Sequence, residues 1–297
     1  MLSIEAFVRI ACFALAGKVP SKEPLELYLR LINSETEVPR GLVKFLNSLA
    51  KSPDFRNHRL ISELENQTNF LIPDQSGTAF SDIIPLGNFC HAAAALKNVG
   101  YRNQAFPFDW LFSSPEMITS CIEDDFLRFL DRSEYQAVPL EQRHDPNSNF
   151  CRHLGFQKDY GISYVFNHHN PEQEKDYQFF QRAVERFRRV LDSPNWKLYL
   201  QVNAGKRCNA SNSHLLSTLR KRTKNFVFVS IEFISSNQRD PASMTLPISC
   251  SRPSHDSLHI ELQTESPSNG VIFQNAKDNL YLQCIIKSFR KVPSVIP

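Results

Sequence analysis

The sequence lacks the features that mark several large classes of protein. Its seven Cys are scattered singly and form no CxxC pair, so neither a zinc knuckle nor a disulfide framework is indicated. The net charge is only +3, from 34 basic and 31 acidic residues, which provides little attraction to nucleic acid. With 9 Gly in all, the chain has no Gly-rich phosphate-binding fingerprint. We therefore expect no metal, no cofactor and no nucleic-acid partner.

A long uninterrupted apolar run is also missing. The stretch 4–16 is fairly apolar, but Glu5 and Arg9 interrupt it and no small-residue cleavage site follows. Nothing approaches the apolar length that a membrane span requires. Unpaired Cys are typical of a reducing compartment. We expect a cytoplasmic protein with no membrane partner.

Phe is what the sequence has in abundance. Its 23 Phe and a hydrophobic fraction of 41% indicate a folded protein with a Phe-rich core. The 297 residues allow one large domain, or a medium domain with a small one. Cys12, Cys121 and Cys284 fall within apolar helical patterns, where we expect each thiol to pack as a small hydrophobe.

Residues 1–66 have the pattern of a small all-helical module, in which Gly and Pro separate three apolar segments. The stretch resembles the bacterial DUF4214-type repeat, on residues 7–9 (FVR), 17–20 (GKVP), 45–48 (FLNS) and 52–55 (SPDF). That resemblance implies a scaffold or interaction role, with a protein partner bound through the module. The polar residues 67–79 are the predicted linker to a second domain over 80–297.

From Phe80 onward, short apolar runs alternate with helical patterns. Such alternation indicates a largely parallel sheet. The predicted fold class is therefore α/β, with a mostly parallel sheet covered by helices on both faces and preceded by the all-helical module. The predicted strands are 83–86, 162–167, 197–202, 226–233, 258–264 and 271–273. The predicted helices are 90–100, 115–130, 172–192, 213–222 and 276–290, with an irregular loop over 132–160.

In an open α/β sheet, ligands bind beyond the carboxyl ends of the strands. Cys90 follows the first predicted strand, and His168 and His169 end the second. Asn203 ends the third, and residues 235–237 follow the fourth. If the strands are parallel, a nucleophile, a base and an amide group share one edge of the sheet.

Cys90 occupies a position that suits a reactive thiol. It lies in the first turn of a predicted helix, whose unpaired N–H groups and dipole favour the thiolate. A neighbouring imidazolium would lower the pKa further and later protonate the leaving group. Asn88 could supply an oxyanion donor beside the Cys90 backbone N–H. The alternative is that Cys90 begins a buried Ala-rich helix and its thiol is merely packed.

Several motifs make residues 80–233 resemble the putative papain-like cysteine peptidases. Residues 84–90 (IPLGNFC) are similar to the family phrase SLG.NC, and 107–110 reproduce its PFDW signature. Residues 160–169 (YGISYVFNHH) are similar to YGI.F.HHF. The resemblance implies a hydrolase centred on Cys90 and one His of the 168/169 pair. The sequence departs from the pattern at Phe89 and Asn170, next to these groups.

The resemblance leaves the supporting residues open. His168 aligns with the first His of the motif, and alternation along a strand sends His168 and His169 to opposite faces. Asn203 is a candidate third member from the chain order Cys, His, Asn, or else a polar cap of its strand. Asp109 of the PFDW motif either orients the catalytic His or bonds backbone donors in a tight turn. Papain folds have an antiparallel sheet, whereas the alternation here predicts a parallel one.

Other classes of function compete with the cysteine hydrolase. Asp256 and His259 have the D-x-x-H spacing of SGNH-type esterases, although 258–260 also fits a strand. A binding or scaffold protein could keep the fold without activity. A glycan-processing protein could hold an anion at the Gly87 loop. The leading hypothesis is a thiol hydrolase or acyl transferase that acts on a peptide or small acyl substrate through a thioester at Cys90.

Overall fold

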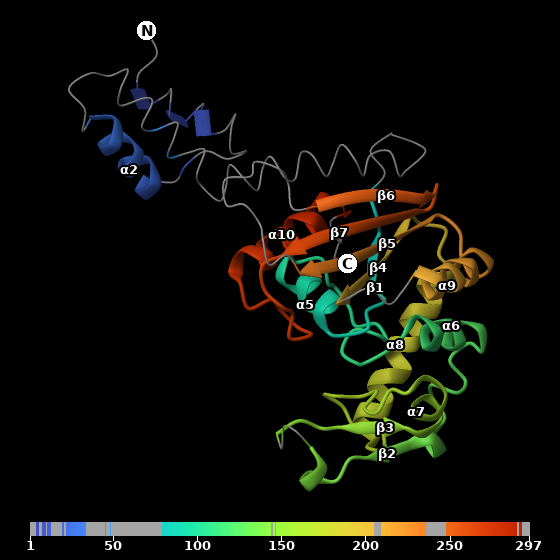
Figure 1. Ribbon diagram of the computed structural model, residues 1–297. Coiled ribbons are helices and arrows are strands. Elements are labelled where there is room, and N and C mark those ends of the chain that lie inside the picture. Colours follow the sequence, from blue (N-terminus) through green and yellow to red (C-terminus); the bar gives the residue numbers. More distant parts are fainter. Residues whose placement is uncertain are drawn as a thin grey trace. The chain divides into compact units, whose positions relative to one another are not determined.

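The computed structural model divides the chain into two compact units, residues 1–68 and 69–297 (Figure 1). The residues that the structure describes are 4–5, 8–9, 11–12, 20, 22–33, 45, 48, 79–143, 145, 147–204, 209–235, 248–289 and 291–292. All but the last residue of the predicted linker at 67–79 lies outside this set.

The first unit contains the amphipathic helix α2 (Lys22–Asn33). Leu25 and Ile32 lie seven positions apart on one face of α2 and are buried. They share an apolar cluster with Val8 and Phe45, and the Phe45 ring packs edge-on against Tyr28. Described residues from all three predicted helical segments are helical.

The second unit is built on a five-stranded sheet with the order β1 (Asp82–Pro85), β4 (Lys197–Ala204), β5 (Phe226–Ser235), β7 (Ser257–Thr264) and β6 (Ile248–Ser254). The first four strands are parallel to their neighbours, and β6 pairs antiparallel with β7 at the edge. The predicted mostly parallel α/β sheet is confirmed. The β5 sequence FVFVSIEFIS is rich in aromatic and β-branched residues, as expected for a central strand covered on both faces.

Helices flank both faces of this sheet (Figure 1). On β4, Tyr199 packs against Phe187 of α8 and against Phe226, so α8 lies over that face with α6 and α9. The α5 helix contacts β4 and α10 on the other side. The helix bounds are α5 (His91–Asn98), α6 (Pro115–Glu123), α7 (Leu154–Tyr160), α8 (Glu174–Asp192), α9 (Asn209–Arg222) and α10 (Ala276–Ser288). Within the described ranges, no helix combines the length and apolarity that a bilayer span needs.

Several predicted boundaries match the structure because a side chain or a glycine determines them. The Ser114 hydroxyl caps α6 by accepting a hydrogen bond from the Met117 N–H at 3.2 Å, with Pro115 at the first helical position. Gly100, with φ of 76°, follows α5 in the left-handed region that favours glycine. The amphipathic α8 buries its four predicted apolar positions, Phe180, Val184, Phe187 and Leu191.

Several expectations about secondary structure were wrong. The predicted strand 271–273 is not a strand, because Phe273 makes only an isolated bridge to Ser268, and the predicted helix 115–130 ends at Glu123. The predicted strand 162–167 is irregular chain, with isolated bridges from Phe166 to Leu111 and to Cys151. The predicted loop 132–160 instead holds α7, two short 3-10 helices (Arg132–Glu134 and Leu140–Gln142) and a small antiparallel sheet of β2 (Tyr135–Ala137) and β3 (Cys151–His153). Strands of three residues are too short to produce a recognisable alternation.

The core of the second unit is rich in Phe, as the composition predicts. Phe108 makes edge or tilted ring contacts with Phe126, Phe129 and Phe187, at centroid separations of 5.8 to 6.3 Å. All four rings are fully buried. Such geometry adds about 0.5–1.5 kcal/mol per pair beyond the burial of apolar area. Phe108 belongs to the PFDW motif, so this core determines where the motif lies.

Lys197, at the start of β4, is buried, and its ammonium group donates three hydrogen bonds. Its Nζ donates to the carbonyl oxygens of Ser193 and Lys224 and to the Thr223 hydroxyl, at 2.6, 3.0 and 2.9 Å. These bonds connect the chain before β4 to the chain before β5, at the amino edge of the sheet. Burial lowers the pKa of the Lys197 ammonium.

Candidate active site

Cys90 lies at the carboxyl end of β1, immediately before α5. Its backbone is helical, with φ of −64° and ψ of −9°, and its carbonyl accepts the first α5 hydrogen bond, from Ala94 N–H at 2.9 Å. The loop that delivers it needs a glycine, because a Cβ on Gly87 would come within 2.7 Å of the Phe89 carbonyl oxygen. The thiol is only 1% exposed.

The side chain that contacts the thiol is Asn167. Its Nδ2 lies 3.7 Å and its Oδ1 4.0 Å from Cys90 Sγ. Burial raises the pKa of Cys90, the nearby charge of Asp109 raises it further, and the Asn167 hydrogen bond opposes both. The sequence predicted a lowered pKa from the helix N-terminus. In the structure desolvation has the largest effect, so the pKa of Cys90 is raised rather than lowered.

His168 and His169 have different surroundings. His168 is exposed, its Nε2 lies 3.3 Å from Asn167 Nδ2, and its ring meets Trp110 edge-on at 6.4 Å. His169 stacks on Phe179 at 4.7 Å, and its Nδ1 lies 3.4 Å from an Asp176 oxygen. Partial desolvation of the ring and the His169 charge lower the pKa of His168.

Asn167 therefore contacts both the Cys90 thiol and the His168 ring. Its side chain separates the two groups that the sequence paired. Among the described residues, no hydrogen bond joins Cys90 directly to His168 or His169. A direct proton transfer between Cys90 and His168 requires the Asn167 amide to turn aside.

The carboxyl edge does bring together residues that are far apart in the sequence. Asn88 Nδ2 donates to Asn203 Oδ1 at 2.9 Å, which links the loop after β1 to the end of β4. Asn203 Nδ2 in turn donates to Gln201 Oε1 at 3.3 Å. Asn203 thus contacts the Asn88 amide rather than either His.

Asp109 is buried next to this site and pairs with Arg102. The Arg102 Nη2 and Nε lie 2.6 and 2.7 Å from Asp109 Oδ2, while the carboxylate is 1% exposed. Burial raises the pKa of Asp109 to about 6, although the Arg102 charge and the Phe106 backbone lower it. The Arg102 guanidinium also lies over the Trp110 ring, 5.6 Å from its centroid.

A comparison with protein families assigns the chain to one of them. Residues 81–238, more than half of the chain, match the model of the family described as "Putative papain-like cysteine peptidase (DUF1796)". The chain belongs to this family. No curated protein and no solved structure matches the chain significantly. The matched range contains Cys90, the PFDW motif and both His, as the motif resemblance indicated.

Three residues in or beside the candidate site carried no predicted role. In the sequence, nothing distinguished Asn167 except its position directly before His168. Arg102 pairs with Asp109 seven positions away, but both lie in irregular chain, so no helix or strand period indicates the pair. His91, next to Cys90, is 3% exposed, and its Nδ1 lies 2.8 Å from the Ser268 hydroxyl. Burial lowers the pKa of His91 to about 4.

The D-x-x-H spacing does not form a catalytic dyad. Asp256 accepts two hydrogen bonds from Arg220, at 2.6 and 2.8 Å, which hold the pKa of its carboxyl at about 2. His259 lies on β7, and its Nε2 is 3.8 Å from Glu232. The two residues thus have separate partners. Among the described residues, no cluster of three or more His, Cys, Asp and Glu is arranged to hold a metal ion.

Proposed function

We propose that the α/β domain is a cysteine-dependent hydrolase that acts on a peptide or other acyl substrate, with Cys90 as nucleophile. The observation that carries the proposal is the position of Cys90, at the carboxyl edge of a parallel sheet and at the start of α5. Asn167, far from Cys90 in the sequence, contacts both the Cys90 thiol and the His168 ring. The family is that of putative papain-like cysteine peptidases.

The proposed reaction passes through a thioester. His168 takes the Cys90 proton as Sγ bonds to the substrate carbonyl carbon. The bond from that carbon to the leaving nitrogen or oxygen then breaks, and the imidazolium returns the proton to the leaving group. Water attacks the thioester, giving its proton to His168 and releasing the acid. Cys90 recovers the proton, so no oxidant or cofactor is consumed.

Asn88 and Asn203 act together in this scheme. The Asn88 amide and the Cys90 backbone N–H are the proposed donors to the oxyanion. The 2.9 Å bond to Asn203 positions the Asn88 amide, so Asn203 is a positioning residue. His169 supports the His168 segment by its contacts with α8, through Phe179 and Asp176. Asp109 positions Arg102 and Trp110 beside His168.

The buried thiol supports a second candidate, a binding domain without catalytic activity. A thiol that is 1% exposed with a raised pKa reacts slowly. The hydrolase therefore needs a substrate-induced opening in which Asn167 moves away from Sγ. We further propose that the helical first unit binds a protein partner, a role that either candidate accommodates.

The test is the hydrolysis of p-nitrophenyl acetate by the full chain. We expect steady turnover that Cys90→Ser abolishes and that His168→Asn slows by about 10²–10⁴-fold, the usual contribution of a general base. His169→Gln is the matched control, because it changes the neighbouring imidazole and leaves most of the rate. Asn203→Ala should lower kcat with little change in KM, since it disturbs only the oxyanion donor.

One outcome would instead support a binding domain without catalytic activity. Release of p-nitrophenol at the same rate by wild type and Cys90→Ser would eliminate the hydrolase proposal. Equal losses for His168→Asn and His169→Gln, with both proteins folded, would remove His168 from the role of base.

A further inference from the structure

One face of the sheet carries polar residues where a covered sheet is normally apolar. The strand register places Gln201, Ser230, His259 and Ser251 side by side across β4, β5, β7 and β6. The row two residues further along contains Asn203, Glu232, Glu261 and Ser249 in the same order. Because alternate residues share a face, both rows lie on the side of α9. The second row includes Asn203, which contacts the Asn88 loop.

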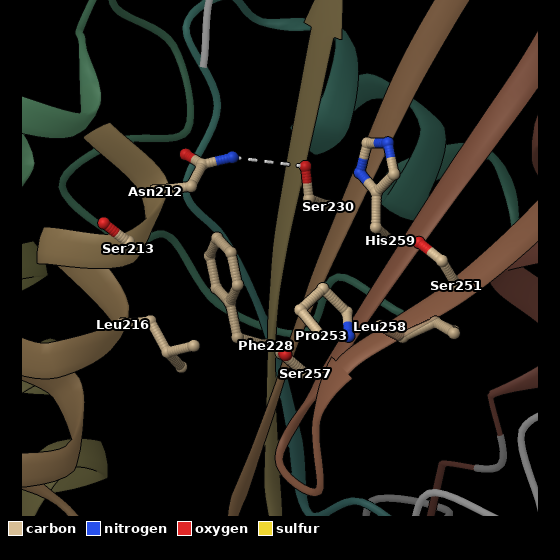
Figure 2. A pocket seen from close by; sticks show the side chains of 10 residues that line it. All are labelled: Asn212, Ser213, Leu216, Phe228, Ser230, Ser251, Pro253, Ser257, Leu258 and His259. Atoms are coloured by element: carbon tan, nitrogen blue, oxygen red, sulfur yellow. Dashed lines mark hydrogen bonds between the residues drawn. The ribbon is translucent and has the colours of Figure 1, made fainter. Parts of the chain in front are cut away.

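A cavity of about 330 Å³ lies over the first of these rows, between α9 and the strands β5, β6 and β7. Figure 2 shows Asn212 and Leu216 of α9 on one side, His259 and Ser251 on the other, and Phe228 with Ser230 between them. This volume is at the small end of the range of about 300–1,000 Å³ that is usual for ligand sites.

The lining of the cavity is mostly apolar, with a few hydrogen-bonding groups set among aliphatic and aromatic side chains. Four Ser hydroxyls, one amide and one imidazole line it together with an aromatic ring and aliphatic side chains. Hydroxyl groups both donate and accept hydrogen bonds, so they match a ligand that does the same. Among the described residues, no Lys, Arg, Asp or Glu lines the cavity, which disfavours a phosphate, a carboxylate or an ammonium group as its ligand.

Two buried polar atoms beside or within the cavity have unused hydrogen-bonding capacity. Asn212 donates from Nδ2 to the Ser230 hydroxyl at 3.4 Å, but its buried Oδ1 has no partner in the described structure. Gln201 is fully buried, and its Nε2 also has none. A hydroxyl-bearing ligand in the cavity would give Asn212 Oδ1 the partner that it lacks, whereas Gln201 lies beside the cavity and does not line it.

We propose that this cavity binds a neutral sugar ring, a single pyranose unit. Its hydroxyls would bond Asn212, Ser230 and Ser251, with His259 at the same wall. The apolar face of the ring would lie on Phe228 and Leu216, since aromatic and aliphatic side chains cover C–H surfaces. The proposal does not depend on the reactivity of Cys90, so it stands or falls separately from the proposed hydrolase.

The experiment measures binding to the full chain with Cys90→Ser, which removes any hydrolysis. The probes are methyl β-D-glucopyranoside, N-acetylglucosamine, glucose 6-phosphate and N-acetylalaninamide, each followed by saturation-transfer NMR. We expect at least one of the two neutral sugars to bind, and glucose 6-phosphate to bind more weakly than that sugar. Asn212→Leu and Ser251→Leu should each weaken binding about tenfold, the effect of one lost hydrogen bond together with steric filling.

Ser249→Leu is the matched control, because Ser249 lies on β6 in the neighbouring row and does not line the cavity. A further measurement uses the chain without any substitution in the cavity. In that protein, the NMR resonance of the His259 ring protons should shift when the sugar is added. Absence of binding by both neutral sugars would overturn the proposal. So would equal binding by Ser249→Leu, Ser251→Leu and Asn212→Leu, an unmoved His259 resonance, or competition by N-acetylalaninamide.

Discussion

Two buried groups beside the candidate nucleophile are expected to titrate with opposite effects on stability. The Asp109 carboxyl has a pKa of about 6 in the folded protein, against an ordinary value of 3.8. Between these values the folded state keeps a proton that the unfolded chain has released, so the free energy of unfolding falls as pH rises. Each pKa unit corresponds to about 1.4 kcal/mol, which gives a loss of about 3 kcal/mol.

His91 acts in the reverse direction over nearly the same range. Its pKa is about 4 in the folded protein, against 6.5 ordinarily, so between these values the unfolded chain holds a proton that the folded state lacks. The free energy of unfolding therefore rises with pH, by about 3 kcal/mol. The contributions of Asp109 and His91 nearly cancel in the wild-type protein.

Asp109→Asn should expose the His91 contribution. Relative to wild type, the free energy of unfolding of this variant should rise by about 3 kcal/mol more between pH 4 and pH 6.5. His91→Gln should show the opposite difference of similar size. Urea titrations followed by Trp fluorescence measure this, because Trp110 and Trp196 are the two Trp of the chain and both lie in the second unit. An identical pH slope for wild type and Asp109→Asn would refute the reasoning.

Three further predictions concern single positions away from the site. Lys197→Met should lower the free energy of unfolding by about 3 kcal/mol, since it leaves three buried acceptors without their donor; urea titration at pH 7 measures this. Gly161→Ala should cost about 1 kcal/mol in the same assay, because Gly161 ends α7 with φ of 68°. Arg220→Met should raise the pKa of Asp256 from about 2 toward 3.8, measurable by NMR titration of the carboxyl carbon.

The alternation of apolar runs was enough to predict the parallel sheet. Four strands have contiguous apolar stretches that the sequence shows directly, as in 226–233. The helices between them have amphipathic patterns, as in α8. The edge strand β6 was missed, because ISCSRPS is polar and contains Pro253. The three-residue strands β2 and β3 have too little sequence to show a period.

The proximity of Asn203 to the Cys90 loop was predictable, but the surroundings of the Cys90 thiol were not. The rule for parallel sheets places Asn203 near the Cys90 loop, and the bond between Asn88 and Asn203 shows this proximity. The sequence could not predict that the thiol would be 1% exposed, because burial depends on how the 162–170 segment folds over it. For the same reason the contact of Asn167 with the thiol was not foreseen. At Cys90 desolvation raises the pKa by more than the Asn167 and backbone hydrogen bonds lower it, and that balance depends on packing.

The most direct test of the account is to identify the residue that carries the acyl group. The full chain would be mixed with p-nitrophenyl acetate, quenched in acid at short times, and mapped by peptide mass spectrometry. The account predicts an acetyl group on the Cys90 peptide that forms in a burst with p-nitrophenol and then declines as substrate is exhausted. An unmodified Cys90, with acetyl groups accumulating only on other residues at the rate seen in Cys90→Ser, would contradict it.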